Sequence, residues 1–185
     1  MSYKKVLVPL AQGCEEIEAV TIIDVLVRGE VEVTAVSLDH QKVITASRGV
    51  KLMVDKTLDE VKDEAFDMIV LPGGLAGADN LLANKTLLNR IQKTVKKEGK
   101  VAAICAAPKV LAQIGLLDNK NATSYPGFID KHPAEGMRYL NKAVVNDGLI
   151  TTSQGPGTAM LFALELLQQL HGEPVRLKVQ QALLY

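Results

Sequence analysis

The chain has 185 residues, and its 21 Lys plus Arg residues balance its 21 Asp plus Glu residues, so the formal net charge at pH 7 is zero. This length predicts one domain, 1–185, because domains commonly contain about 100 to 200 residues. Zero net charge excludes the strongly basic surface that binds nucleic acid or an anionic membrane. The few aromatic residues, three Phe and four Tyr with no Trp, argue against a base-stacking surface.

Hydrophobic periodicity predicts alternating strands and helices in the first half of the chain. An unbroken apolar run is typical of a strand covered on both faces, and Gly29 is a helix stop. In chain order we expect a strand at 6–10, a helix at 15–28, a strand at 31–37, and short β runs at 42–45 and 50–54 that form a hairpin or edge pair.

The second half continues the alternation. The expected elements are a strand at 66–71, a helix at 86–97, a strand at 101–104, a helix at 108–115, one or two strands at 143–152, and helices at 158–170 and 175–184. The irregular stretch 119–141 is long enough for a functional loop or small extra helices. Such alternation predicts an α/β fold, with a mostly parallel sheet between two layers of helices.

The two cysteines, Cys14 and Cys105, cannot form a disulfide framework and fit a reducing compartment. Lys4 and Lys5 before the apolar run 6–11 superficially resemble a signal peptide, but the run is too short for a signal core. No apolar stretch approaches the roughly 18 residues of a membrane span. We therefore expect a soluble, cytoplasmic protein without membrane association.

Unusual residues follow four of the expected strands. Because ligands of open α/β sheets bind beyond the carboxyl ends of the strands, these segments predict one shared site. They are 12–18 after the first strand, Pro72-Gly73-Gly74, Cys105-Ala106-Ala107-Pro108, and 153–158 after the last strand.

The segment around Cys105 resembles a nucleophile elbow, in which small residues such as Ala103 and Ala107 flank an exposed nucleophile on a strained turn. A helix N-terminus after it, with Pro108 in the first turn, is expected to lower the pKa of the thiol. The alternative is a buried, inert thiol, and the local pattern does not choose between them.

Three carboxylates, Glu15, Glu16 and Glu18, lie in the first turn of the first helix, where acidic residues usually face water. Spacing does not choose among them. Glu18 precedes apolar Ala19, so it could point inward. A buried carboxyl would have a raised pKa and could donate a hydrogen bond to a thiolate.

Gly73 and Gly74 could expose backbone N–H groups for an oxyanion hole shared with Ala106, although a tight turn would also need glycine. Gly155 and Pro156 could simply begin a helix. Cys14 is either a spectator or within reach of Cys105. The three histidines, His40, His132 and His171, follow no metal-ligand spacing, so we predict surface positions and no metal site.

Together these motifs resemble the ThiJ/PfpI superfamily, specifically its branch with the Parkinsonism-associated deglycase and the bacterial protein YajL. The resemblance covers nearly the whole chain. It rests on four motifs in matching order: Gly13-x-Glu15-Glu16-x-Glu18, Leu71-Pro72-Gly73-Gly74, 102–108, and 152–158.

The resemblance implies a flavodoxin-like sandwich related to class I glutamine amidotransferases, a homodimer, and no cofactor. It implies Cys105 as nucleophile, Glu18 as its protonated partner, and Gly74 and Ala106 as oxyanion donors. It also places Arg28 and Arg48 at the approach to the site and the dimer contact, where Asp24 could pair with Arg48. The implied activity is a glutathione-independent glyoxalase or deglycase that acts on small reactive carbonyls or glycated side chains. The implied alternative is a redox-sensing chaperone whose Cys105 oxidises to sulfinate.

The sequence departs from the human member of the family at one position. Tyr125 occupies the place, before Pro126, where that member has a histidine. A Cys-His pair therefore cannot be carried over, and His132 is a weak substitute. The older protease label loses support, because a protease needs a base that activates its nucleophile. The resemblance also implies an older functional label of the family, thiazole monophosphate biosynthesis.

Overall fold

The structure is a computed structural model, and it describes residues 3–185. Its centre is a seven-stranded sheet in the order β10-β11-β7-β6-β1-β2-β5, parallel throughout except for the antiparallel pair β10 and β11. The strands are Lys5–Leu10 (β1), Glu32–Ser37 (β2), Lys56–Thr57 (β5), Met68–Leu71 (β6), Lys100–Ile104 (β7), Val144–Asp147 (β10) and Ile150–Ser153 (β11). Two separate pairs are β3 (Val43–Thr45) with β4 (Lys51–Met53), and β8 (Asn121–Ala122) with β9 (Arg138–Tyr139).

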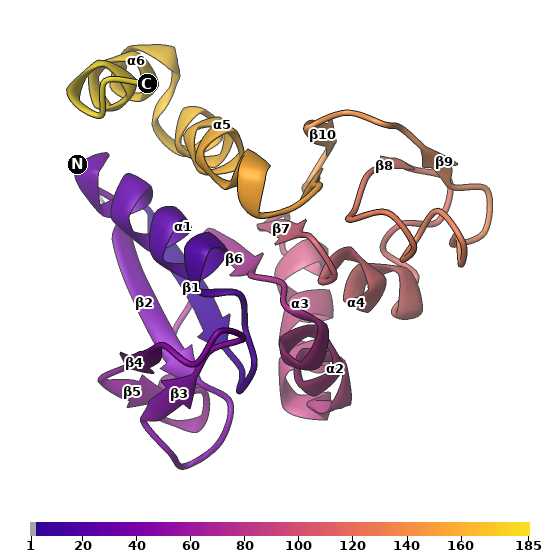
Figure 1. The fold of residues 1–185 in the computed structure, drawn as a ribbon, viewed down its shortest axis with the longest axis horizontal. Helices are drawn as coiled ribbons and strands as arrows, with labels where there is room; N and C mark the ends of the chain where they lie inside the picture. Colours follow the sequence, from indigo (N-terminus) through magenta and orange to yellow (C-terminus); the bar gives the residue numbers. More distant parts are fainter. Residues whose placement is uncertain (1–2) are drawn as a thin grey trace.

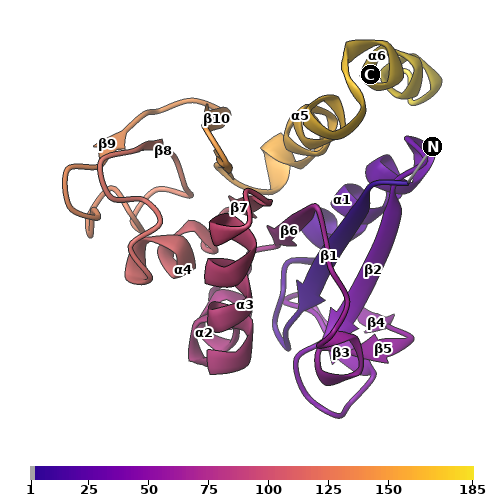
Figure 2. The same cartoon turned by 180° about the vertical axis from the view of Figure 1, so that it is seen from behind.

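Helices cover both faces of the sheet, as Figures 1 and 2 show from opposite sides. One face carries α1 (Glu16–Arg28), α5 (Ala159–His171) and α6 (Glu173–Ala182), and the other carries α2 (Leu75–Ala83), α3 (Lys85–Lys96) and α4 (Pro108–Gln113). Short 3-10 turns lie at Asp59–Val61 (η1) and Pro156–Thr158 (η2).

The central strands are apolar on both sides because each side packs against a helical layer. Along β1, Val6 and Val8 join the core cluster of α1 and α5, whereas Leu7 joins the cluster of α3 and α4. This is the alternation of a strand, whose successive side chains point to opposite faces. The predicted three-layer, flavodoxin-like α/β sandwich is confirmed.

Most of the predicted elements are confirmed, including the hairpin of β3 and β4. The irregular stretch 119–141 contains β8 and β9 instead of extra helices. Helix α2 was not predicted, because Gly77 interrupts its pattern and glycine is a weak helix former. Close packing explains this glycine: a Cβ on Gly77 would lie 2.7 Å from Cα of Cys14.

The parallel strands β1, β6, β7 and β11 all end at one edge of the sheet, so the motifs that follow them meet there. The loop after β1 is fixed in place by backbone hydrogen bonds: Gly77 N donates to Gly13 O (3.2 Å) and Glu15 N donates to Gly73 O (3.0 Å). Within residues 3–185, no helix combines the length and apolar character that crossing a membrane requires.

Candidate functional site

Cys105 occupies a strained turn between β7 and α4. Its φ angle is +64°, which is uncommon for a residue with a side chain and costs about 1–2 kcal/mol. Two hydrogen bonds hold this conformation: Cys105 N donates to Ser153 O (3.0 Å), and Tyr125 N donates to Cys105 O (2.9 Å). Ala103 and Ala107 are fully buried on either side. The geometry is that of the predicted elbow, and the thiol is partly exposed at its tip.

Glu18 points inward and its side chain is completely buried. Its Oε2 accepts a hydrogen bond from the N–H of Gly73 at 2.7 Å. Its Oε1 has no hydrogen-bond partner among residues 3–185. Burial, opposed by the Gly73 hydrogen bond and by the nearby Cys105 thiol, raises the pKa of Glu18 from 4.5 to about 7. The chain therefore holds a carboxyl that keeps its proton near neutral pH.

The pKa of Cys105 departs from the sequence prediction. Burial, with the Glu18 charge as the next cause, raises the pKa of Cys105 from 9.0 to about 12. The N–H groups of Gly74 and Ala106 lower this pKa, but they do not outweigh burial. The prediction that the following helix lowers the pKa of Cys105 overall is therefore wrong, because loss of water around the sulfur costs more than the oriented N–H groups return.

Cys105 and Glu18 titrate as a coupled pair, because each side chain changes the pKa of the other. When Glu18 is protonated, its charge no longer opposes the thiolate, and its free oxygen can donate a hydrogen bond to the sulfur. One proton can thus lie on either the sulfur or the carboxyl, and the apparent pKa values belong to the pair.

Gly73 lies between the thiol and the carboxyl. A Cβ at this position would lie 2.6 Å from Cβ of Cys105 and 2.8 Å from Oε2 of Glu18. Because the Gly73 N–H binds Glu18, it is not available as an oxyanion donor, and that part of the prediction is wrong. The backbone N–H groups of Gly74 and Ala106 lower the pKa of Cys105, so they favour negative charge on its sulfur, and their role as oxyanion donors stays a prediction. Gly74 has a φ angle of +86° and packs on the Gly13 backbone, where no side chain fits.

The other two carboxylates of the first turn bind the hairpin of β3 and β4. The Ser47 hydroxyl lies 2.7 Å from Oε2 of Glu15 and 2.8 Å from Oε2 of Glu16. Arg48 N donates to Oε1 of Glu16 at 2.9 Å. Burial acts to raise the pKa of Glu16, but hydrogen bonds from its own backbone N–H, from Ser47 and from Arg48 lower it below the ordinary value. Sequence spacing did not distinguish the three carboxylates. The hairpin does, because it binds Glu15 and Glu16 and leaves Glu18 as the carboxyl beside Cys105.

Cys105 opens into a pocket of about 790 Å³. Its walls include Glu15, Ser47 and Arg48 on one side, with Tyr125, Phe128 and Pro156 also in the lining. A cavity of 300–1,000 Å³ is typical of sites that hold small organic molecules. Gly155 does not line it but supports Tyr125, because a Cβ there would lie 3.1 Å from the Tyr125 ring.

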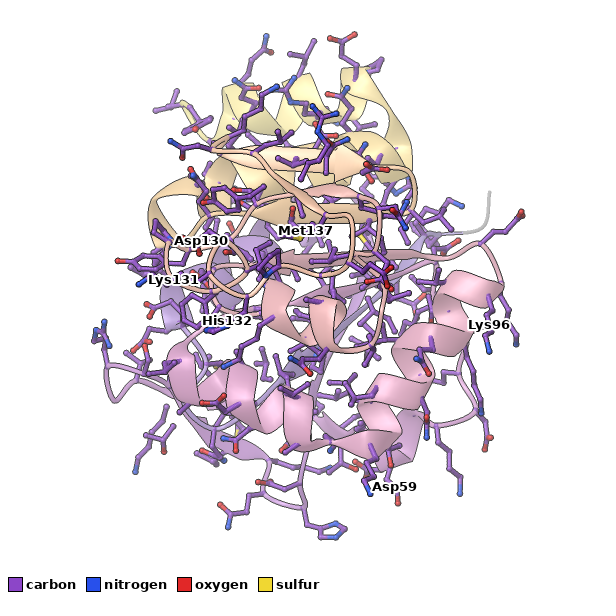
Figure 3. The ribbon with its side chains drawn as sticks, turned by 90° about the vertical axis from the view of Figure 1, so that its right-hand side faces the viewer. Asp59, Lys96, Asp130, Lys131, His132 and Met137 are labelled. Carbon is purple, nitrogen blue, oxygen red and sulfur yellow. The ribbon has the colours of Figure 1, made fainter. Side chains whose placement is uncertain are left out.

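Two predicted peripheral residues, Arg28 and Cys14, lie outside the pocket lining, and so does His132, the weak substitute for the family histidine. Arg28 is at the far end of α1, where its Nε pairs with Asp24 at 2.7 Å, and it does not line the pocket. Cys14 is almost fully buried, and burial raises its pKa to about 12. His132 is exposed on the loop that Figure 3 shows with Asp130 and Lys131, and it does not line the pocket. Of the other histidines, His40 is exposed, whereas His171 is half-buried, contrary to the prediction of a surface position.

The structure adds pocket residues that the motifs did not reveal. Ser47 reaches Glu15 only through the tertiary position of the hairpin, and Asp79 lies on the unpredicted helix α2. Phe128 carried a usable signal, because it is an aromatic residue close to Tyr125 in a chain with few aromatics. The described residues 3–185 contain no group of three or more His, Cys, Asp or Glu side chains placed to hold a metal ion.

The chain is similar to known proteins over nearly its whole length. Residues 4–169 match the sequence profile of the DJ-1/PfpI family. "Protein DJ-1 homolog A" of Arabidopsis thaliana is 42% identical over 182 residues, which are 98% of this chain but 46% of that protein, so the chain spans about half its length. "Glutathione-independent glyoxalase DJR-1.2" of Caenorhabditis elegans is 35% identical over 161 residues, covering 87% of this chain and 85% of that protein.

A solved structure is also similar over its whole length. The crystal structure of Drosophila melanogaster DJ-1beta has a TM-score of 0.94 and 37% sequence identity, covering 99% of this chain and 98% of that one. The similarity therefore extends from the sequence profile to the complete fold. The resemblance expected from the four motifs is confirmed, and the chain belongs to the DJ-1/PfpI family.

Proposed function

We propose that the protein is a cysteine-dependent, glutathione-independent glyoxalase that acts on methylglyoxal, glyoxal or their adducts during carbonyl or oxidative stress. The observation that carries this proposal is the partly exposed Cys105 thiol beside the fully buried Glu18 carboxyl at a pocket. A nucleophile next to a group that exchanges protons near neutral pH is the combination that this reaction needs. The name of the C. elegans relative supports the same activity.

The reaction can be written with this chain's own residues. The Cys105 thiolate adds to the aldehyde carbon of methylglyoxal, and the resulting oxyanion takes up a proton to form a hemithioacetal. Glu18 removes the hydrogen of that carbon as a proton and delivers it to the neighbouring carbon through an enediol. The first carbon is thereby oxidised to a thioester while the neighbouring carbonyl is reduced to a hydroxyl, so no cofactor is required.

Water completes the reaction by hydrolysis. It adds to the thioester, the carbon–sulfur bond breaks, and lactate leaves while Cys105 recovers its proton. The N–H groups of Gly74 and Ala106, which favour negative charge on the sulfur, would stabilise the oxyanions formed next to it. The same steps on a glycated Lys, Arg or Cys side chain would make the protein a deglycase and release lactate or glycolate. The enzyme is of the hydrolase type if the glycated adduct is the substrate, and of the lyase type if the free dicarbonyl is the substrate.

The test is the formation of lactate from methylglyoxal by the purified wild-type protein in the absence of glutathione. We expect steady turnover, with one lactate per methylglyoxal consumed. If the wild-type protein consumes methylglyoxal without releasing lactate, only adduct formation occurs and the proposed function is wrong.

A redox-sensing chaperone is the second candidate. The free Oε1 of Glu18 and the N–H groups of Gly74 and Ala106 would bind the oxygens of a Cys105 sulfinate. After mild peroxide treatment, we expect mass spectrometry to show two added oxygen atoms on Cys105 and none on Cys14, which is 1% exposed. Oxidation of Cys14 with Cys105 still reduced would contradict this candidate.

We also propose that the protein is a homodimer. Ile17, Val20 and Val27 are about half exposed along one side of α1, and Val43, Val50 and Met53 are exposed on the adjoining hairpin. Ser47 joins these two surfaces through its hydrogen bonds to Glu15 and Glu16. Exposed apolar side chains on two linked elements mark an interface, and a two-fold axis would bring them against their own copy.

Val20→Lys is expected to dissociate this dimer, because each interface would gain two buried charges. Sedimentation should give twice the monomer mass for the wild type and the monomer mass for the variant. Leu184→Lys is the matched control, since Leu184 is 96% exposed at the C-terminus and should leave the dimer intact. A monomeric wild-type protein would contradict the proposal.

We further propose that residues 1–185 act as one domain in the cytoplasm. The support for one domain is that a single sheet takes strands from Lys5 to Ser153. The support for a reducing compartment is that Cys14 and Cys105 are both free thiols.

A further inference from the structure

The pocket beside Cys105 has an aromatic wall, defined here as Tyr125 and Phe128. The two rings meet edge to face, with their centroids 6.4 Å apart and their planes at 76°. The Tyr125 side chain is 50% exposed, so part of its ring is available to a ligand. Both residues line the same cavity as Cys105.

The backbone and the neighbouring side chains hold this wall in place. Tyr125 N donates to the carbonyl oxygen of Cys105 at 2.9 Å, which ties the position of the ring to the nucleophile itself. Behind the ring lies Gly155, whose missing side chain leaves the space that the ring occupies.

Phe128 is fixed from the other side. The ammonium of Lys109 lies 5.5 Å from the centre of the Phe128 ring and pairs with Asp79 of α2. The Lys109 side chain is only 20% exposed, so this link between α2 and α4 is partly removed from water. Contacts from α2, α4 and the backbone of Cys105 therefore hold the aromatic wall in place before a ligand arrives.

The pocket is larger than the reaction requires. A cavity of about 790 Å³ is in the range that encloses a drug-sized ligand, whereas a dicarbonyl of two or three carbons fills a small part of it. The thiol and the carboxyl account for the reacting carbons, and the mechanism above uses neither aromatic ring. The aromatic wall shares the pocket with the Cys105 thiol, so it is available to the substituent of a larger α-oxoaldehyde.

We propose that Tyr125 and Phe128 form a subsite for a planar aromatic substituent on the substrate, so that the site favours aryl α-oxoaldehydes over methylglyoxal. This inference rests on the proposed glyoxalase function. Aromatic rings gain from stacking beyond the burial of their area. A contact made equally in the ground state and the transition state lowers KM and leaves kcat unchanged.

The experiment compares phenylglyoxal with methylglyoxal as the ratio of their kcat/KM values, so that effects common to both substrates cancel. Tyr125→Ala and Tyr125→Leu should lower this ratio about 3- to 10-fold, chiefly by raising KM for phenylglyoxal. Tyr125→Phe should keep the ratio within about twofold, because it retains the ring. Tyr185→Ala is the matched control, since Tyr185 is 57% exposed and lies outside the pocket.

A binding measurement separates this inference from the proposed function. NMR titration of Cys105→Ala protein with acetophenone needs no turnover, and adding Tyr125→Ala should weaken binding by the same factor. If the wild type forms no lactate but this loss of affinity is found, the proposed function fails and the subsite stands. If lactate forms while neither the ratio nor the affinity changes, the subsite is overturned. Equal loss of activity toward both substrates in Tyr125→Phe would also overturn it, because the phenol would then act on the shared reacting group.

Discussion

Cys105→Ala is expected to reduce lactate formation from methylglyoxal by on the order of 10³-fold or more, since it removes the nucleophile that forms the covalent intermediate. Alanine keeps the small size that the elbow requires and leaves the φ angle of +64° no more strained than cysteine does. The backbone hydrogen bonds to Ser153 and Tyr125 are also retained. The comparison of lactate release by wild type and variant under the same conditions measures the effect.

Cys14→Ala is the matched control for this loss. Cys14 is buried in the core that includes α1, does not line the pocket, and should keep activity within a few-fold of the wild type. Equal lactate release by wild type and Cys105→Ala would show that the thiol has no part in turnover. Loss of activity in Cys14→Ala at unchanged thermal stability would give Cys14 a role that its position does not suggest.

Glu18→Gln is expected to lower kcat by about 10²- to 10⁴-fold, because the amide cannot carry the proton between the two substrate carbons. Glutamine can still accept the hydrogen bond from Gly73 N and fills the same space, so the fold should be retained. Covalent capture of the aldehyde by Cys105 should persist in the variant, which mass spectrometry can detect. Full activity in Glu18→Gln would exclude the carboxyl as the proton carrier.

The same substitution should change how stability depends on pH. Because burial raises the pKa of Glu18 from 4.5 to about 7, the folded chain keeps a proton between these pH values that the unfolded chain has lost. The free energy of unfolding should therefore fall as pH rises through this window, by up to about 3 kcal/mol from this group. Denaturant titrations between pH 4.5 and 8 should show this fall in the wild type and not in Glu18→Gln.

Glu135→Gln is the control for the pH series, because Glu135 is exposed. The free energy of unfolding of this variant should depend on pH in the same way as that of the wild type. A constant difference between the wild type and Glu18→Gln across the window would mean that Glu18 ionises in the folded chain as it does in water.

Local pattern was sufficient to predict most elements of this fold. The apolar run of β1 and the alternation of strands and helices depend on neighbouring residues, and they predicted the parallel sheet correctly. Helix α2 was missed, since its stability comes from packing against α3, α4 and the backbone at Gly13 and Cys14. A segment with weak helix propensity becomes helical when tertiary contacts bury it.

By itself the sequence determined the family, the architecture and the meeting of Cys105 with the first-helix carboxylates at one edge of the sheet. These follow from motif order and from the rule that parallel strands present their carboxyl ends together. The tertiary structure alone decided that Glu18 is buried while Glu15 and Glu16 bind Ser47. It also decided that Gly73 holds Glu18, and that burial raises the pKa of Cys105. The physical reason is that desolvation and hydrogen-bond geometry depend on groups distant in sequence, which no local spacing encodes.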